Sequence, residues 1–175
     1  MTTLFDDKGE ALNVTLVECG AKVTLVRNLE KDGYTAVQLE IDKTKNKRVK
    51  KEFRTEAPTL KINDTVGVDI FEIGDIVQVS GTGKAKGFQG VVKRYGFGGA
   101  PSSHGRKHDM RKPGAIGAGY PEHVIKGKRM AGRMGGKRTT SENIKIAYID
   151  KEKNILGLKG PVPGIPGTII ELYTN

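Results

Sequence analysis

The sequence is poor in cysteine and in long apolar runs, and both shortages narrow what it can be. Cys19 is the single cysteine of 175 residues, which excludes an internal disulfide framework and a paired-cysteine zinc site and favours a reducing compartment. It stands in a strand-like run, where a lone cysteine usually serves as a small buried hydrophobic residue. The sequence has no apolar run long enough to cross a bilayer as a helix. The first ten residues, MTTLFDDKGE, are acidic and lack the features of a signal or transit peptide, so we expect a cytosolic protein.

Size and charge point to one domain with a polyanionic partner. A chain of this length suits one ordinary domain, and a hydrophobic content of 36% is enough for a modest core. The net charge of +10 and the sequence pI of about 9.7 favour nucleic acid, the commonest polyanion in a cell. An anionic membrane is the alternative, but no basic amphipathic helix accompanies the charge.

The positive charge is concentrated in one segment, Gly81 to Arg138. It holds fourteen lysines and arginines against Asp109 and Glu122, a local net charge of +12, so the remaining residues carry −2 in sum. The segment also contains fifteen glycines and shows almost no apolar periodicity between Tyr95 and Arg133. A stretch of this composition is suited to lie against a negatively charged partner.

The rest of the chain reads as short strands. Period-two alternation and β-branched content predict strands at 11–18, 22–28, 34–41, 65–73, 75–80, 88–94, 143–150, 155–159 and 168–173. We expect the first two to be joined by a short turn, and Lys151–Asn154 to form another. The charge-rich run 42–54 is interpreted as a connector, an exposed loop or one helical turn, either simply solvated or a second phosphate contact. The fold class is therefore all-β, mainly antiparallel, a small barrel or sandwich.

We predict a discontinuous body at 1–94 and 135–175 and a basic, glycine-rich extension at 95–134. Ordering about forty irregular residues costs on the order of 40–80 kcal/mol of backbone entropy, and the extension has few apolar groups to offset it. It should become ordered on a partner that contacts it along its length.

The sequence contains no motif that supports a catalytic site or a metal site. The glycine-lysine runs 81–87 and 132–138 lack the spacing or the Ser/Thr of a phosphate-binding loop. His104 and His108 are four residues apart, but glycine and proline around them argue against a helix, and neither they nor His123 have cysteine or glutamate at a ligand spacing. We expect no catalytic residue, no metal, no cofactor and no small-molecule substrate.

Nucleic-acid binding fits the details. Cations recur between glycines, which let the backbone approach phosphates, and aromatic and histidine side chains are interleaved as stacking groups. A thin irregular segment suits folded RNA better than a duplex groove. The candidate RNA-binding residues are Lys84, Lys86, Lys93, Arg94, Tyr95, His104, Arg106, Lys107, His108, Arg111, Lys112, Tyr120, His123, Lys126, Lys128, Arg129, Arg133, Lys137 and Arg138.

Four motifs resemble a known family. They are KGFQGVVKRYGFGGAPSSHG at 86–105, RKPGAIG at 111–117, KGKRMAGRMG at 126–135 and KGPVPGIPG at 159–167. Together they resemble the bacterial type of the third protein of the large ribosomal subunit. The resemblance implies a six-stranded barrel-like body and a loop that penetrates large-subunit ribosomal RNA toward the peptidyl transferase centre, with its tip at 115–121. It also implies a non-enzymatic role in early subunit assembly in the cytoplasm, with neighbouring ribosomal proteins as further partners and no membrane.

The sequence departs from that family in three places. The basic lead-in is absent, the connector after Gln38 is short, and the tip GAGYPEHV lacks the glutamine that many bacterial members methylate. The methylation is therefore not transferred to this chain. The run 77–94 alone would also suit a small-barrel RNA-binding translation or transcription factor, which is the alternative function.

Overall fold

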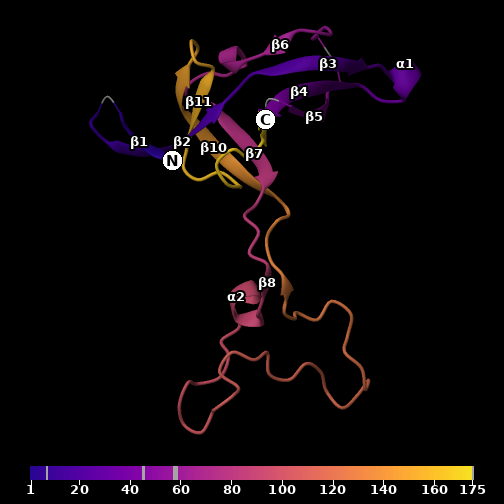
Figure 1. Ribbon diagram of the computed structural model, residues 1–175, viewed down its shortest axis with the longest axis vertical. Helices are drawn as coiled ribbons and strands as arrows, with labels where there is room; N and C mark the ends of the chain where they lie inside the picture. The colour runs from indigo at the N-terminus through magenta and orange to yellow at the C-terminus, as the bar shows by residue number, and fades with distance from the viewer. Residues whose placement is uncertain (7, 45, 57–58, 175) are drawn as a thin grey trace. The chain divides into compact units, whose positions relative to one another are not determined.

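The computed structural model describes residues 1–6, 8–44, 46–56 and 59–174 and divides into two compact units. The first, named here the body, comprises Met1–Thr82 and Thr139–Asn175, and the second, the basic unit, comprises Gly83–Arg138. Figure 1 shows that strands dominate the body and irregular chain dominates the basic unit. The expected class, mainly antiparallel β with a long irregular basic segment, is confirmed. The finer division at 94/95 and 134/135 stays a prediction.

The larger sheet of the body pairs strands from distant parts of the chain. Its order is β1 (Thr2–Phe5), β2 (Ala11–Glu18), β11 (Ile155–Lys159), β10 (Arg138–Asp150), β7 (Ile76–Thr82) and β12 (Ile170–Thr174). Antiparallel ladders join β2 to β11 and β7 to β12. These ladders hold the two sequence segments of the body together.

A second, four-stranded sheet is built mainly from consecutive strands. Its order is β5 (Lys47–Arg54), β4 (Ala36–Thr44), β3 (Ala21–Arg27) and β6 (Thr65–Val66). The helical turn α1 (Leu29–Asp32) links β3 to β4 and ends at Gly33, whose φ of 76° is left-handed. A 3₁₀ turn, η1 (Val68–Ile70), follows β6. Over the described residues, no helix is long and apolar enough to span a membrane.

The core consists of branched aliphatic side chains from both sheets and η1. The largest fully buried ones are Val14, Val23, Val68, Val77, Val79, Ile146, Leu156 and Leu158. Each such burial contributes about 1.5–3 kcal/mol. Cys19 packs against this core, and burial raises the pKa of its thiol above the ordinary value of 9.0. Cys19 thus packs against the core as a small residue, although it is half-buried and not fully buried as predicted.

The first two predicted strands are joined by only two residues, Cys19 and Gly20, as expected, but they do not pair with each other. Strand β2 pairs with β1 and β11, whereas β3 pairs with β4 and β6. Gly20 lies between β2 and β3 with a φ of 138°. Glycine adopts this backbone angle at little energetic cost, whereas residues with a side chain rarely do. The chain therefore changes sheets at the point where local pattern suggested a turn.

The predicted connector at 42–54 is also wrong, apart from residue 45, which lies outside the described residues. Most of it forms the end of β4 and the whole of β5, with Val37 opposite Phe53 and Ile41 opposite Val49. The cations that suggested a loop pair across the strands: Arg48 lies 3.2 Å from Glu40. Alternating apolar and paired charged residues thus make a half-buried hairpin.

Two further strands are shorter than predicted. Of 65–73, Thr65–Val66 alone is strand and η1 follows. Of 88–94, the first two residues form β8 (Phe88–Gln89) and the rest enters a short helix, α2 (Val91–Tyr95). The helix starts after Gly90 and ends at Gly96, whose φ is 72° and whose N–H donates to the Val92 carbonyl. The flanking glycines, rather than the β-branched valines, decide the local structure.

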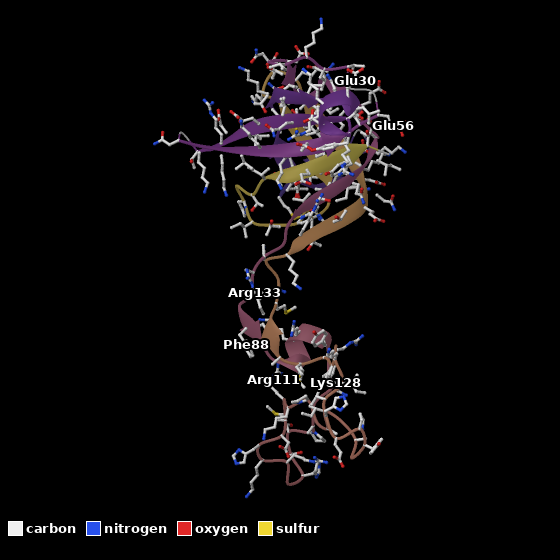
Figure 2. All side chains as sticks on the ribbon, turned by 90° about the vertical axis from the view of Figure 1, so that its right-hand side faces the viewer. Glu30, Glu56, Phe88, Arg111, Lys128 and Arg133 are labelled. Atoms are coloured by element: carbon white, nitrogen blue, oxygen red, sulfur yellow. The ribbon has the colours of Figure 1, made fainter. Side chains whose placement is uncertain are left out.

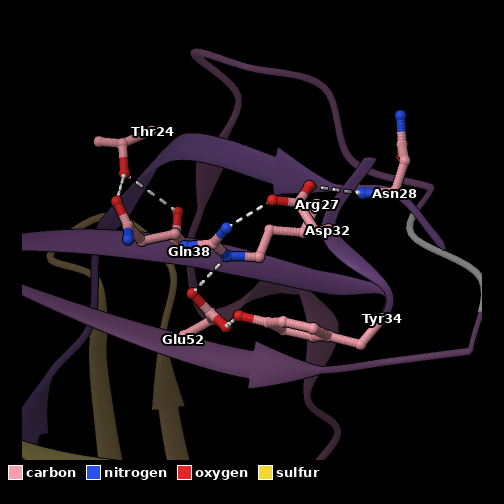
Figure 3. Close-up of polar contacts among 7 residues, drawn as sticks. All are labelled: Thr24, Arg27, Asn28, Asp32, Tyr34, Gln38 and Glu52. Atoms are coloured by element: carbon pink, nitrogen blue, oxygen red, sulfur yellow. Dashed lines mark hydrogen bonds and ion pairs between the residues drawn. The ribbon is translucent and has the colours of Figure 1, made fainter. Parts of the chain in front are cut away.

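A polar network ties α1 to the hairpin of β4 and β5 (Figure 3). Arg27 donates to Asp32 at 2.6 Å and to Glu52 at 2.9 Å, and the Tyr34 hydroxyl donates to Glu52 at 2.7 Å. The hydrogen bonds from Tyr34 and Arg27 lower the pKa of Glu52 below its ordinary value of 4.5. The same Glu52 carboxylate raises the pKa of Tyr34. This network holds the turn α1 against the β4–β5 hairpin on the surface of the body.

Candidate nucleic-acid interface

The basic unit begins and ends in a short antiparallel ladder, named here the neck ladder (83–90 and 132–138). Strand β8 pairs with β9 (Gly132–Arg133), placing Phe88 opposite Arg133. The Lys86 N–H donates to the Met134 carbonyl, and the Met134 N–H donates to the Gly87 carbonyl, both at 2.9 Å. These bonds fix the spacing of the outgoing and returning chain.

Gly135 is required in this ladder by geometry. Its φ is 72°, and a Cβ at this position would overlap the Lys84 carbonyl oxygen. A glycine therefore allows segments 83–90 and 132–138 to approach each other more closely than any residue with a side chain would.

Helix α2 is fastened to the returning chain by Arg94. The Arg94 guanidinium donates to the Met130 carbonyl at 2.6 Å and lies 5.0 Å from the centre of the Tyr95 ring. Arg129 approaches the same ring at 5.8 Å, and the Phe97 ring centre lies 6.3 Å from that of Tyr95. Arg94 and Tyr95 were predicted to contact RNA; in the structure both also organise the basic unit internally.

The remaining chain of the basic unit makes open loops with few internal bonds. The Ala100 N–H donates to the Met110 carbonyl at 3.1 Å and closes the loop between them. Residues of this loop and of its flanks line a hollow of about 610 Å³, among them Phe97, Arg106, Asp109 and Lys112. Asp109 pairs with Lys112, which leaves the Phe97 ring and the Arg106 guanidinium as the groups that could meet a base or a phosphate.

All the predicted RNA-binding residues lie in the basic unit, and all except the half-buried Arg94 are exposed. Lys112 pairs with Asp109 at 3.2 Å, an exposed pair worth little energetically. His123 Nδ1 lies 2.8 Å from the Pro121 carbonyl oxygen. In Figure 2, Arg111 and Lys128 lie at about the same level of the unit and Arg133 lies above them. The structure thus spreads the cations over a surface and does not focus them into one pocket.

The described part of the chain contains no cluster of three or more His, Cys, Asp and Glu side chains that could hold a metal. His104 and His108 are exposed members of the loop that Ala100 and Met110 close. Their surroundings suit contact with an external partner.

Sequence reasoning missed Phe88. Its side chain is 76% exposed, and the sequence pattern assigned it only to the predicted strand 88–94, with no role in binding. The available signal was its position between cations and glycines, in GKAKGFQG.

Comparison with known proteins gives a consistent result. Residues 49–160 match the model of the family described as ribosomal protein L3. Relatives named large ribosomal subunit protein uL3 are 42% identical in Herpetosiphon aurantiacus, covering 97% of this chain and 90% of the relative, and 40% identical in Desulfotalea psychrophila, covering 100% and 94%. A third, from Prochlorococcus marinus, is 41% identical over 100% of this chain and 90% of its own length.

Proposed function

Because the chain belongs to the ribosomal protein L3 family, we propose that it binds large-subunit ribosomal RNA through the basic unit. As a member of this family it is a structural protein of the large ribosomal subunit and not an enzyme. The proposal adds the mode of action: RNA contact along Gly83–Arg138, nucleation of early subunit assembly and approach of residues 115–121 to the peptidyl transferase centre. It also includes residence on cytoplasmic ribosomes beside other large-subunit proteins.

One observation carries the proposal. The basic unit combines a net charge of +12 with exposure of nearly all its cations and only two carboxylates. Val91 alone among its side chains is a fully buried hydrophobic residue, so the unit has little core of its own. Such a surface gains most of its binding energy by displacing counterions from phosphates.

The salt dependence of binding tests the proposal. A labelled transcript of large-subunit ribosomal RNA is titrated with the purified chain between 50 and 200 mM salt. If about six to ten cations contact phosphates, affinity falls by roughly 10³–10⁵ over that range. Lys126→Ala should lower the slope of log affinity against log salt by about 1, whereas Lys151→Ala in the turn before β11 should leave it unchanged. A flat response would contradict phosphate contact.

Two further experiments test the finer parts. A protein that washes off ribosomal particles at moderate salt would be an exchangeable factor, not an integral constituent. For the tip, Ala118→Cys in a Cys19→Ser background carries a tethered iron chelate. Hydroxyl-radical cleavage of the assembled subunit should then fall near the peptidyl transferase centre, and cleavage confined to other regions would refute that placement.

A further inference from the structure

Phe88 is an aromatic ring displayed on regular backbone within the basic unit. It stands in the neck ladder opposite Arg133, next to the hydrogen bonds that join Lys86 and Gly87 to Met134. Its side chain is nevertheless 76% exposed, and Figure 2 shows it on the short ladder beside Arg133. A hydrophobic ring on a braced strand is thus presented to solvent in a fixed position.

The surroundings of Phe88 are cationic. Residues directly opposite in an antiparallel pair project from the same face, so Arg133 shares the face of Phe88. Lys84 and Lys86 precede it and are exposed, and the neck ladder contains no carboxylate. The Arg133 guanidinium lies along the neck, since a Cβ at Gly136 would stand 3.0 Å from its Nη2.

Phe88 differs from the other rings near it in having no aromatic or cationic partner among the described residues, whereas Tyr95 contacts Phe97, Arg94 and Arg129. A neutral ring can offer RNA its π-face, and bases stack on such faces irrespective of their identity. The charge around it attracts the phosphate backbone of the same nucleotide.

We propose that Phe88 is a stacking platform for one unpaired nucleobase of RNA, with Arg133 contacting the adjoining phosphate. The inference rests on the proposed RNA binding and adds to it a specific residue and the unpaired state of the base. An apolar contact with a neighbouring protein is the competing use of the ring, and the charge of the neck ladder favours RNA.

The test compares Phe88→Ala, Phe88→Leu and Phe88→Tyr for affinity to the large-subunit ribosomal RNA transcript. Removing a stacked ring should weaken binding about 5- to 150-fold, for both Ala and Leu, while Tyr retains near wild-type affinity. Because the side chain is neutral, the salt slope should stay unchanged, in contrast to Arg133→Ala, which lowers it by about 1. Phe5→Ala is the matched control, since Phe5 is also 76% exposed but lies in the body.

A second measurement identifies the contact directly. Short-wave ultraviolet irradiation of the complex, followed by mass spectrometry of the peptides, should show a nucleotide adduct on Phe88. Unchanged affinity of Phe88→Ala with no adduct would overturn the inference while leaving RNA binding intact; failure of the wild-type chain to bind the transcript would remove the proposed function itself. Loss of a protein neighbour from Phe88→Ala particles at unchanged RNA affinity would assign the ring to protein and also overturn the inference.

Discussion

Replacement of Gly135 by alanine should loosen the neck ladder far more than the same change at Gly87. Both glycines have left-handed backbones, with φ of 72° and 65°, but a Cβ at Gly135 would overlap the Lys84 carbonyl whereas one at Gly87 meets nothing within 4 Å. Gly87→Ala therefore incurs the conformational penalty of about 1–2 kcal/mol that an L-residue meets in this region. Gly135→Ala incurs the same penalty and must also displace backbone.

The extra cost follows from the hydrogen bonds next to the overlap. Displacing Lys84 disturbs the bond from the Gly136 N–H to the Gly83 carbonyl, 3.2 Å, and that from the Lys86 N–H to the Met134 carbonyl, 2.9 Å. At about 0.5–1.5 kcal/mol each, their loss adds about 1–3 kcal/mol. Amide hydrogen exchange at Lys86 should accordingly be about 5- to 150-fold faster in Gly135→Ala than in Gly87→Ala.

Nuclear magnetic resonance of the RNA-free protein measures this exchange residue by residue. The Val79 amide in the body serves as an internal reference that neither substitution should affect. Equal exchange rates at Lys86 in the two variants would refute the reasoning. They would mean that the overlap of a Cβ at Gly135 with Lys84 does not destabilise the neighbouring hydrogen bonds.

Three other predictions concern the body and the isolated chain. Gly157→Ala should lower the free energy of unfolding by about 1–3 kcal/mol in urea titrations, because its Cβ would stand 2.8 Å from the Tyr148 Cβ and 2.9 Å from the Val14 Cγ1; an unchanged midpoint would contradict this. Since the folded-state pKa of Glu52 is depressed, its contribution to stability is present above pH 4.5 and lost as pH falls through the lower folded value. Glu52→Gln should therefore reduce stability at pH 7 and flatten the acid limb of the stability curve, and parallel curves would refute it. Trypsin should cut free protein first within 95–134, and added ribosomal RNA should protect that region; protection without RNA would contradict ordering on a partner.

The basic unit was predictable because its evidence is local. The density of lysine, arginine and glycine between Gly81 and Arg138 needs no knowledge of partners in the fold, and the exposure of those cations in the structure agrees with it. Strands with clear alternation, such as 11–18 and 155–159, were located correctly for the same reason.

Strand partners were not predictable from local pattern. The run after Glu18 looks like a tight turn, yet β2 and β3 belong to different sheets because their partners lie elsewhere in the chain. The strand character of 47–54 was hidden because Arg48 and Lys50 resemble loop residues until Asp42 and Glu40 are placed opposite them. Cross-strand neutralisation is a tertiary property.

Within the candidate site, sequence composition revealed which residues are cationic but not which of them the protein itself uses. Arg94 reads like any other phosphate contact, and only the position of the Met130 carbonyl shows that it fastens α2. Phe88 was predicted only as part of a strand, and its exposure on the neck ladder is what points to a role in binding. Both distinctions depend on side-chain geometry.

The pairing of β2 with β11 has a consequence for the order of events during synthesis. Val17 must wait for Leu156, about 140 residues later, and at about 5–20 residues per second that delay is about 7–30 s. The basic unit, Gly83–Arg138, is synthesised within this delay, before the strand that completes the sheet exists. The cationic segment is therefore available to RNA before its own protein has finished folding.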